Sequence, residues 1–210
     1  MTPLIGIVLA LTALYVLFLA WYGGNGRPMT RAEIDRFDRE FASLCVGPDR
    51  QDELDAIGAL VAGDDGKEFV MHNLVRHRAK ALYPAGYDFG DDPRAADRRY
   101  AKAIVWPLLR HGNLVLFVAR RTGRFMQPPG ADDWHYVAMV RYRSRRDFLR
   151  FALAIEREDI VVHKWAAIER THIFPVKPMI SLIFVRGAVA AALTLVGAAL
   201  FWIARAGGLA

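Results

Sequence analysis

Two long apolar segments without acidic or lysine residues, one near each end of the chain, enclose a middle region of mixed polarity. Residues 2–22 contain no charged side chain, and Arg186 is the only charge in residues 179–204. About 20 apolar residues in a helix are long enough to cross the hydrocarbon core of a bilayer. The pattern therefore predicts a transmembrane helix in each segment. A cleaved signal peptide is the alternative for the first, but the segment lacks a basic start and a small-residue cleavage site.

The segment 30–62 shows the spacing of two short amphipathic helices. Thr30 and Glu33 form a capping-box pattern at the start of the first helix. Gly47-Pro48 is expected to end it, and a second helix is expected over 52–61. We therefore predict a short helical linker segment here.

From Lys67 onward, runs of alternating apolar residues are separated by two helical patterns. The helices are expected to begin after Asp92 and Ser144, which are good N-cap residues. Four strands are expected, over 68–76, 113–119, 134–143 and 161–173. The order β-α-β-β-α-β is that of a ferredoxin-like domain. The predicted fold class is therefore α+β, with a ferredoxin-like domain over 67–175 flanked by two transmembrane helices.

Charge and composition add a predicted location. The chain has 210 residues, a formal net charge of +6 and a single cysteine, Cys45, which excludes an internal disulfide. Arginines and lysines lie on the inner side of both apolar segments, among them Arg27, Arg31 and Lys177. The positive-inside tendency then predicts a two-pass membrane protein with a cytoplasmic domain. The basic residues of that domain alternate with nearly as many acidic ones, so nucleic acid is not an expected partner.

Several segments of the middle region resemble a known family. They are Phe69–Arg76, the pair Tyr83-Pro84, the stretch Pro107–Gly112, the stretch Val140–Phe148 and the stretch His163–Ile168. Together they resemble the uncharacterised bacterial DUF1330 and EthD-like domains of the dimeric α/β-barrel type. The resemblance implies a bacterial protein that forms a homodimer through its sheet, with a pocket between sheet and helices. Together with the two predicted transmembrane helices, this gives the bacterial inner membrane as the expected location. Members of the wider superfamily include small-molecule oxygenases, isomerases and haem enzymes.

Asn73 is the most informative polar residue for a pocket. It shares a face of the first predicted strand with Phe69, Met71 and Val75, and a buried amide there needs hydrogen-bond partners. Those partners belong either to a ligand or to a neighbouring loop or strand. The predicted pocket set is Asn73, Tyr100, Trp134, Tyr136 and Arg141.

Arginines cluster before the helix that Ser144 caps. Arg143, Arg145 and Arg146 are expected to face anions or lipid headgroups, because cationic side chains beside a membrane attract anionic lipids. An anion site at the start of the helix is the alternative.

No pattern for catalysis is present in the sequence. The six histidines have no metal-ligand spacing, and there is neither a glycine-rich phosphate loop nor a nucleophile elbow. We therefore assign no catalytic residue, metal or cofactor. The expected function is a membrane-anchored accessory or scaffold subunit, with the bilayer and either a second copy or a membrane protein as partners. The alternative is a small-molecule-binding protein or an oxygenase-like enzyme, and the sequence leaves enzymatic activity open.

Overall fold

The computed structural model describes residues 3–44, 50–180 and 185–206. Cys45 and the Gly47-Pro48 break fall outside these residues, and the side chain of Arg186 is also outside the described part. The chain divides into two units, residues 1–177 and 178–210. The second unit contains one described helix, α7 (Val185–Ala206).

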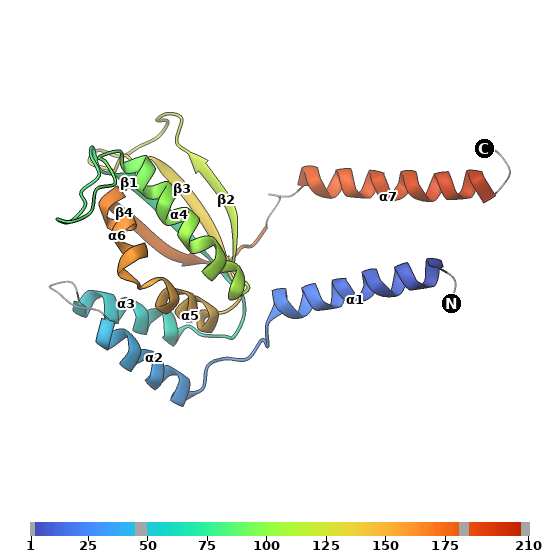
Figure 1. Ribbon diagram of the computed structural model, residues 1–210, viewed down its shortest axis with the longest axis horizontal. Helices are drawn as coiled ribbons and strands as arrows, with labels where there is room; N and C mark the ends of the chain where they lie inside the picture. Colours follow the sequence, from blue (N-terminus) through green and yellow to red (C-terminus); the bar gives the residue numbers. More distant parts are fainter. Residues whose placement is uncertain (1–2, 45–49, 181–184, 207–210) are drawn as a thin grey trace. The chain divides into compact units, whose positions relative to one another are not determined.

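The first unit is an α+β structure built on a four-stranded sheet (Figure 1). The predicted α+β class is confirmed. The described strands are β1 (Phe69–His77), β2 (Leu114–Arg120), β3 (Tyr136–Tyr142) and β4 (Ile168–Val176). The described helices are α1 (Pro3–Gly23), α2 (Arg31–Leu44), α3 (Arg50–Ala62), α4 (Pro93–Arg110), α5 (Arg145–Ile155) and α6 (Glu158–Ala167).

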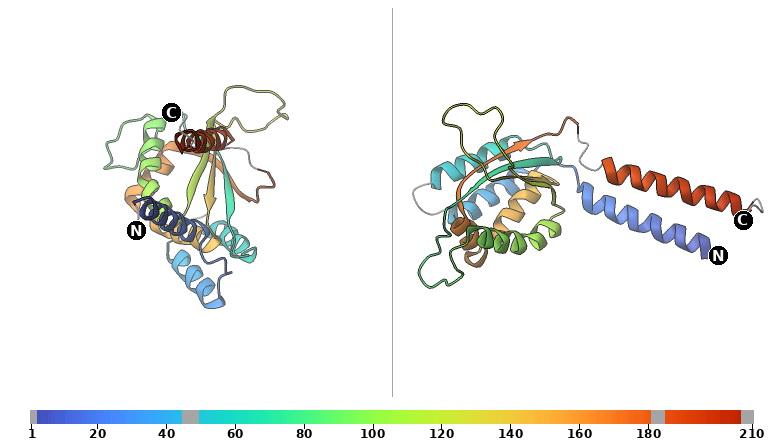
Figure 2. Two further views of the ribbon diagram at one scale, coloured as in Figure 1. Left: turned by 90° about the vertical axis from the view of Figure 1, so that its right-hand side faces the viewer. Right: turned by 90° about the horizontal axis from the view of Figure 1, so that it is seen from above.

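The strand order is β2-β3-β1-β4, and every neighbouring pair is antiparallel. Helices α4, α5 and α6 lie on one side of the sheet (Figure 2). Asp92 caps α4 by accepting a hydrogen bond from the Arg94 amide, and Pro93 occupies the first turn. Ser144 caps α5 in the same way, through the Asp147 amide. Both caps were predicted at these residues from the sequence.

The main core lies between the sheet and these helices. Phe69 and Tyr142 stack there with ring centroids 5.5 Å apart, and Phe151 packs beside them. Burial of such aromatic side chains is a large favourable contribution to folding.

Helices α2 and α3 pack on α5 through a second apolar cluster. Leu149 of α5 is fully buried between Phe37 and Phe41 of α2 and Val61 of α3. Arg146 of α5 also binds Glu33, with Nε 2.9 Å from Oε1. The predicted linker segment therefore contributes side chains to the core of the first unit.

The last strand begins later than predicted. The sequence suggested a strand over 161–173, but α6 occupies Glu158–Ala167 and β4 starts at Ile168. The β-branched run at 160–162 favoured a strand, whereas Glu158 and Asp159 favour a helix start through the helix dipole. Packing of Ile160, Ala166 and Ala167 against the remaining structure decides for the helix, because tertiary contacts override weak local preferences.

Among the helices within the described residues, none combines the length and the apolar character that crossing a membrane requires. This finding contradicts the predicted transmembrane helices at 2–22 and 179–204. It also contradicts the two-pass inner-membrane location, which rested on them.

The C-terminal end of α1 is hydrogen-bonded to the rest of the first unit. Trp21 donates its indole N–H to the Leu109 carbonyl at 3.1 Å. Arg143 donates to the Trp21 carbonyl at 2.8 Å, and Arg141 donates to the Tyr22 carbonyl at 2.9 Å. These carbonyls lie at the end of a helix, where cations are favourable partners for the unpaired backbone groups.

Candidate functional site

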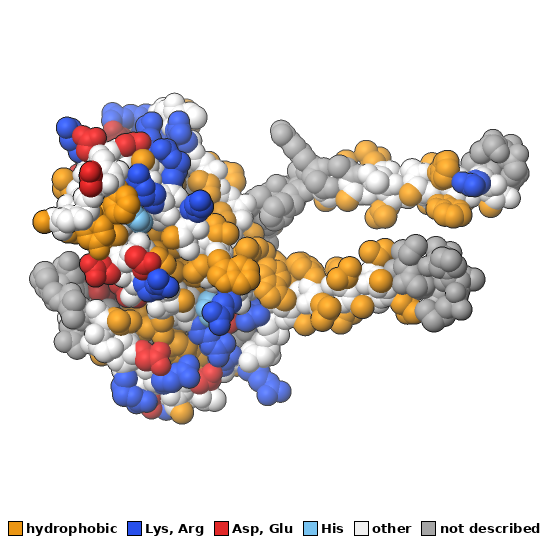
Figure 3. Space-filling model, viewed as in Figure 1, with side chains coloured by type: hydrophobic (Ala, Val, Ile, Leu, Met, Phe, Trp, Pro, Cys, Tyr) orange, Lys and Arg blue, Asp and Glu red, His pale blue; other side chains and the backbone are white. Residues whose placement is uncertain are grey.

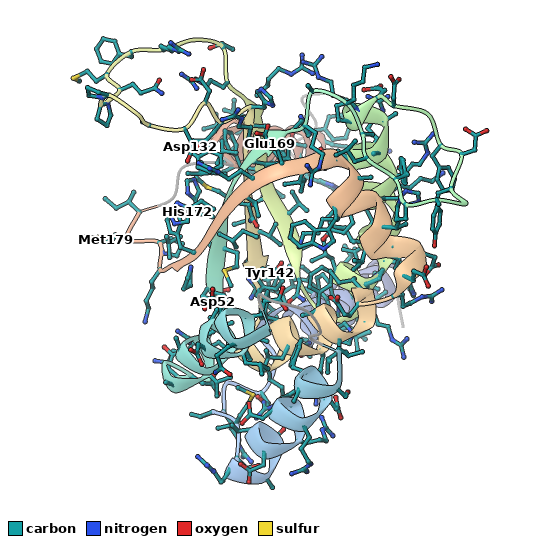
Figure 4. The ribbon with its side chains drawn as sticks, turned by 90° about the vertical axis from the view of Figure 1, so that its left-hand side faces the viewer. Asp52, Asp132, Tyr142, Glu169, His172 and Met179 are labelled. Carbon is teal, nitrogen blue, oxygen red and sulfur yellow. The ribbon has the colours of Figure 1, made fainter. Side chains whose placement is uncertain are left out.

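A cavity of about 870 Å³ lies between the sheet and the helices α4, α5 and α6. Successive residues of a strand point to opposite faces, so one set of each strand lines it. From β1 these are Met71, Asn73, Val75 and His77, and from β3 they are Tyr136, Ala138, Val140 and Tyr142. Figure 4 shows Tyr142 on the side of the sheet that the helices cover. His172 of β4 does not line the cavity, and its ring packs beside Phe174, with centroids 5.0 Å apart.

A bulge in β2 widens the apolar wall. The register shifts between Val115 and Phe117, so Leu116 has no partner in β3. Because of this extra residue, Val115 and Val118 both line the cavity although they are three positions apart. Val118 is 61% exposed, which places it at an open edge of the cavity.

Asn73 sits in a cross-strand row that is otherwise apolar. Its neighbours in the register are Ile173 on one side and Ala138 on the other, followed by Val118. The Asn73 Nδ2 donates to the carbonyls of Met71 and Ala138, at 3.0 and 3.2 Å. Its Oδ1 accepts no hydrogen bond from the described residues. The side chain is thus fixed by the backbone while an acceptor stays available at the cavity wall.

A polar cluster formed by His77, Asp97 and Tyr136 closes one end of the cavity. His77 Nε2 lies 3.1 Å from Asp97 Oδ2, and the two side chains are only 10% and 20% exposed. The Tyr136 hydroxyl donates to Asp97 Oδ1 at 3.3 Å. Asp97 therefore uses both carboxylate oxygens to hold a strand residue from β1 and another from β3 against α4.

Tyrosine hydroxyls supply neutral polar groups to the same cavity. Burial raises the pKa of Tyr100 and of Tyr136, and the nearby Asp97 carboxylate raises both further. Both phenols are therefore protonated at neutral pH and can donate hydrogen bonds. The Tyr100 hydroxyl has no hydrogen-bond partner within the part of the chain that the structure describes, which leaves it free for a ligand.

The opposite end of the cavity is mainly apolar, although Glu156, next to Ile155, and Lys164 also line the cavity. It is formed where the C-terminal half of α4 meets α5, by Ile104, Leu108, Phe148, Phe151 and Ile155. The cavity therefore has a polar end at the start of α4 and an apolar end towards its last turns. A ligand that fits it would have two chemically different ends.

Four of the five residues predicted for a pocket line this one cavity, namely Asn73, Tyr100, Trp134 and Tyr136. Arg141 does not, because strand alternation turns it away from its neighbours Val140 and Tyr142. It is 3% exposed and donates to Glu68 Oε2 at 2.7 Å and to the Gly112 carbonyl at 3.0 Å.

The arginines expected to face lipids or anions are engaged within the protein. Arg143 binds both carboxylate oxygens of Asp147, at 2.7 and 2.9 Å. Arg145 lies 3.3 Å from Asp65. Arg146 binds Glu33 and is only 7% exposed. Arg145 and Arg146 thereby join α5 to the N-terminal part of the first unit.

The central pair of the polar cluster, His77 and Asp97, was not recognised from the sequence. His77 and Asp97 lie 20 positions apart, and no motif connects them. Only the packing of α4 on the sheet brings them together. Within the residues that the structure describes, no group of three or more His, Cys, Asp or Glu side chains is arranged to hold a metal ion.

No family model matches this chain, and no curated protein does either. Two solved structures are similar: the RPA0582 protein of unknown function from Rhodopseudomonas palustris, and the methylated RPA0582 protein. Both are 23% identical to this chain. The match to the first covers 60% of this chain and 94% of RPA0582, and the match to the methylated protein covers 61% and 93%. The TM-scores are 0.53 and 0.54.

Similarity at this level of identity concerns the fold alone. The expected resemblance to DUF1330 and EthD-like domains is contradicted, because no family model matches and the similar structures are of unknown function.

Proposed function

We propose that this protein binds a small molecule in the cavity between its sheet and the helices α4, α5 and α6. The observation that carries the proposal is the cavity of about 870 Å³ with the His77–Asp97–Tyr136 cluster at one end. Ligand sites in proteins are typically concave, mostly apolar, and about 300–1,000 Å³ in volume, with a few polar groups that fix orientation. This cavity has each of these properties.

The strand order supports a finer description of the domain as ferredoxin-like. In that fold two β-α-β units are interleaved, and the first and last strands are antiparallel neighbours. The order β2-β3-β1-β4, with α4 after β1 and α5 after β3, agrees with this arrangement. The cavity then occupies the space between the sheet and its crossover helices.

A scaffold or accessory subunit is the other function that the sequence suggested. Such a subunit needs no internal cavity, and its sheet and helices would be expected to pack closely, as protein interiors normally do. The partly buried Asn73 and Tyr100 side chains, each with an unused polar group, favour the binding function instead.

Fluorescence of the neutral apolar dye N-phenyl-1-naphthylamine tests this function. The dye becomes bright when it leaves water, and it is added to the full-length chain. The variant Ala101→Trp places a large side chain at an exposed lining position of α4. The matched control is Val105→Trp, because Val105 lies on the same helix, is 49% exposed and does not line the cavity.

We expect Ala101→Trp to raise the dissociation constant of the dye at least about fivefold, which corresponds to roughly 1 kcal/mol of lost binding free energy. Val105→Trp should bind as the original chain does. Equal binding by all three proteins would overturn the proposal, because the dye would then be bound outside the cavity.

A further inference from the structure

The cavity is lined by more cationic than anionic side chains. Six lining residues are cationic and three are anionic. The cations are Arg94, Arg98, Arg120, Arg121, Arg124 and Lys164, and the anions are Asp97, Asp133 and Glu156. All of the arginines lie at the polar end, on the first turns of α4, at the end of β2 and in the loop that follows it. Figure 3 shows Lys and Arg side chains over both the upper and the lower parts of the domain, interspersed with Asp and Glu.

Partners within the protein account for only part of this charge. Arg121 and Arg124 both bind Asp133. Arg98 has a long contact of 3.6 Å with the exposed Asp92. Arg94 and Arg120 form no side-chain ion pair with any described residue, and both are exposed.

These two arginines stand beside the polar cluster. Arg120 is the register partner of Tyr136 across β2 and β3. Arg94 lies three positions before Asp97 on α4, so the two residues share a helix face. Both arginines therefore border the end of the cavity where Asp97 and Tyr136 meet.

The Asp97 carboxylate does not require a cationic ligand. One oxygen is bound by His77 and the other by the Tyr136 hydroxyl. The electrostatic environment of the neighbouring His135 is positive on balance. The pKa of that histidine is lowered by burial and then by His77 and the cations Arg76 and Arg94.

We infer that the ligand is an amphipathic anion, with an apolar body in the cavity and an anionic group between Arg94 and Arg120. The inference rests on the proposed function and adds the chemical class of the ligand. A carboxylate is a group that arginine binds with good geometry, since the guanidinium presents paired donors. The apolar body then extends towards Leu108 at the apolar end of the cavity.

Three compounds with the same chain and different head groups test this inference. Dodecanoate, dodecanol and dodecylamine are each titrated into the full-length chain with bound N-phenyl-1-naphthylamine, and displacement of the dye is followed. Dodecanoate should displace it at about fivefold lower concentration than dodecanol, because two exposed ion pairs each contribute a modest amount. Dodecylamine should be the weakest. The preference for dodecanoate should decrease in about 0.5 M NaCl, which screens exposed charges.

The double variant Arg94→Gln/Arg120→Gln should lose the preference, so that dodecanoate and dodecanol displace the dye at the same concentration. The control Arg39→Gln/Arg110→Gln removes the same charge at two exposed positions that do not line the cavity, and should keep it. Equal displacement by the three compounds, or stronger displacement by dodecylamine, would overturn the anionic class while the binding function stands. If Ala101→Trp leaves dye binding unchanged, the proposed function itself fails.

Discussion

The hydroxyl of Tyr136 on β3 donates a hydrogen bond of 3.3 Å to Asp97 on α4. This bond crosses from the sheet to the helix that covers it. Asp97 also holds His77 of β1, so one carboxylate connects three elements of the fold. The same carboxylate forms the polar end of the cavity, and the residues that position α4 are therefore also residues that a ligand would meet.

The Asp97→Ala variant tests the structural part of this relationship. It leaves His77 and Tyr136 without their acceptor, and we expect the free energy of unfolding to fall by about 1–3 kcal/mol. Chemical denaturation of the full chain measures this. Asp38→Ala, at an exposed position of α2, is the control because it makes the same change in a helix and should have little effect. Equal effects in the two variants would show that the Asp97 contacts contribute nothing to stability.

The apolar cluster around Leu149 should contribute much of the free energy that holds α2 and α3 on α5. Leu149 is fully buried, so Leu149→Ala should lower the free energy of unfolding by about 2–5 kcal/mol. Leu82, which is 62% exposed, serves as the matched position, and Leu82→Ala should change stability by less than about 0.5 kcal/mol. A small effect at Leu149 would mean that the helices do not depend on this cluster.

Protonation of Glu33 should lower the stability of the folded protein in acid. Hydrogen bonding to the Thr30 amide, and then to Arg146, lowers the pKa of Glu33 from 4.5 to about 2. A carboxyl group with a lowered pKa in the folded state contributes stability above its unfolded pKa. That contribution is lost as the pH falls from about 4.5 to about 2. Glu33→Gln should therefore show a weaker decrease in stability over this range than the original chain.

The control for this experiment is Glu40→Gln. Glu40 forms an exposed pair with Arg36 at 3.5 Å, and such pairs contribute little. Stability is measured by urea denaturation at several pH values. Parallel curves for Glu33→Gln and the original chain would contradict the assigned role of Glu33.

Gly66 is expected to be intolerant of a side chain. Its φ angle is +69°, and an added Cβ would lie 2.3 Å from the backbone carbon of Arg27. Gly66→Ala should therefore destabilise the protein by more than the roughly 1 kcal/mol that a left-handed conformation costs. Gly86→Ala is the comparison, because Gly86 has a φ angle of +94° and open space around it. Thermal unfolding of both variants separates the clash from the strain, and equal shifts would exclude the clash.

Strands β1, β2 and β3 and helices α2, α3, α4 and α5 could be predicted from the sequence, for identifiable reasons. Strand β3 alternates over its full length, and the caps at Asp92 and Ser144 are strong local signals. The start of β4 could not be predicted. The β-branched residues at 160–162 favour a strand locally, and only the packing of α6 against α4 makes this segment helical. The apolar patterns near the termini led to a membrane location that the described helices do not support.

The candidate site was only partly accessible from the sequence. Asn73 and Tyr136 were recognised because alternation assigns residues to a face of a strand. Arg141 was predicted to line the pocket together with Tyr136. It lies five positions after Tyr136 and one before Tyr142 in β3, so strand alternation places it on the opposite face of the sheet. Asp97 could not be recognised, because its contacts with His77 and Tyr136 depend on how α4 crosses the sheet.

The most direct test of the binding function is native mass spectrometry of the full-length chain purified gently from its own host. We predict a reproducible small-molecule mass on the original chain and on Val105→Trp, and its loss on Ala101→Trp. A chain without any small molecule would contradict the account, and more so if other protein subunits accompany it at fixed stoichiometry, as a scaffold function predicts.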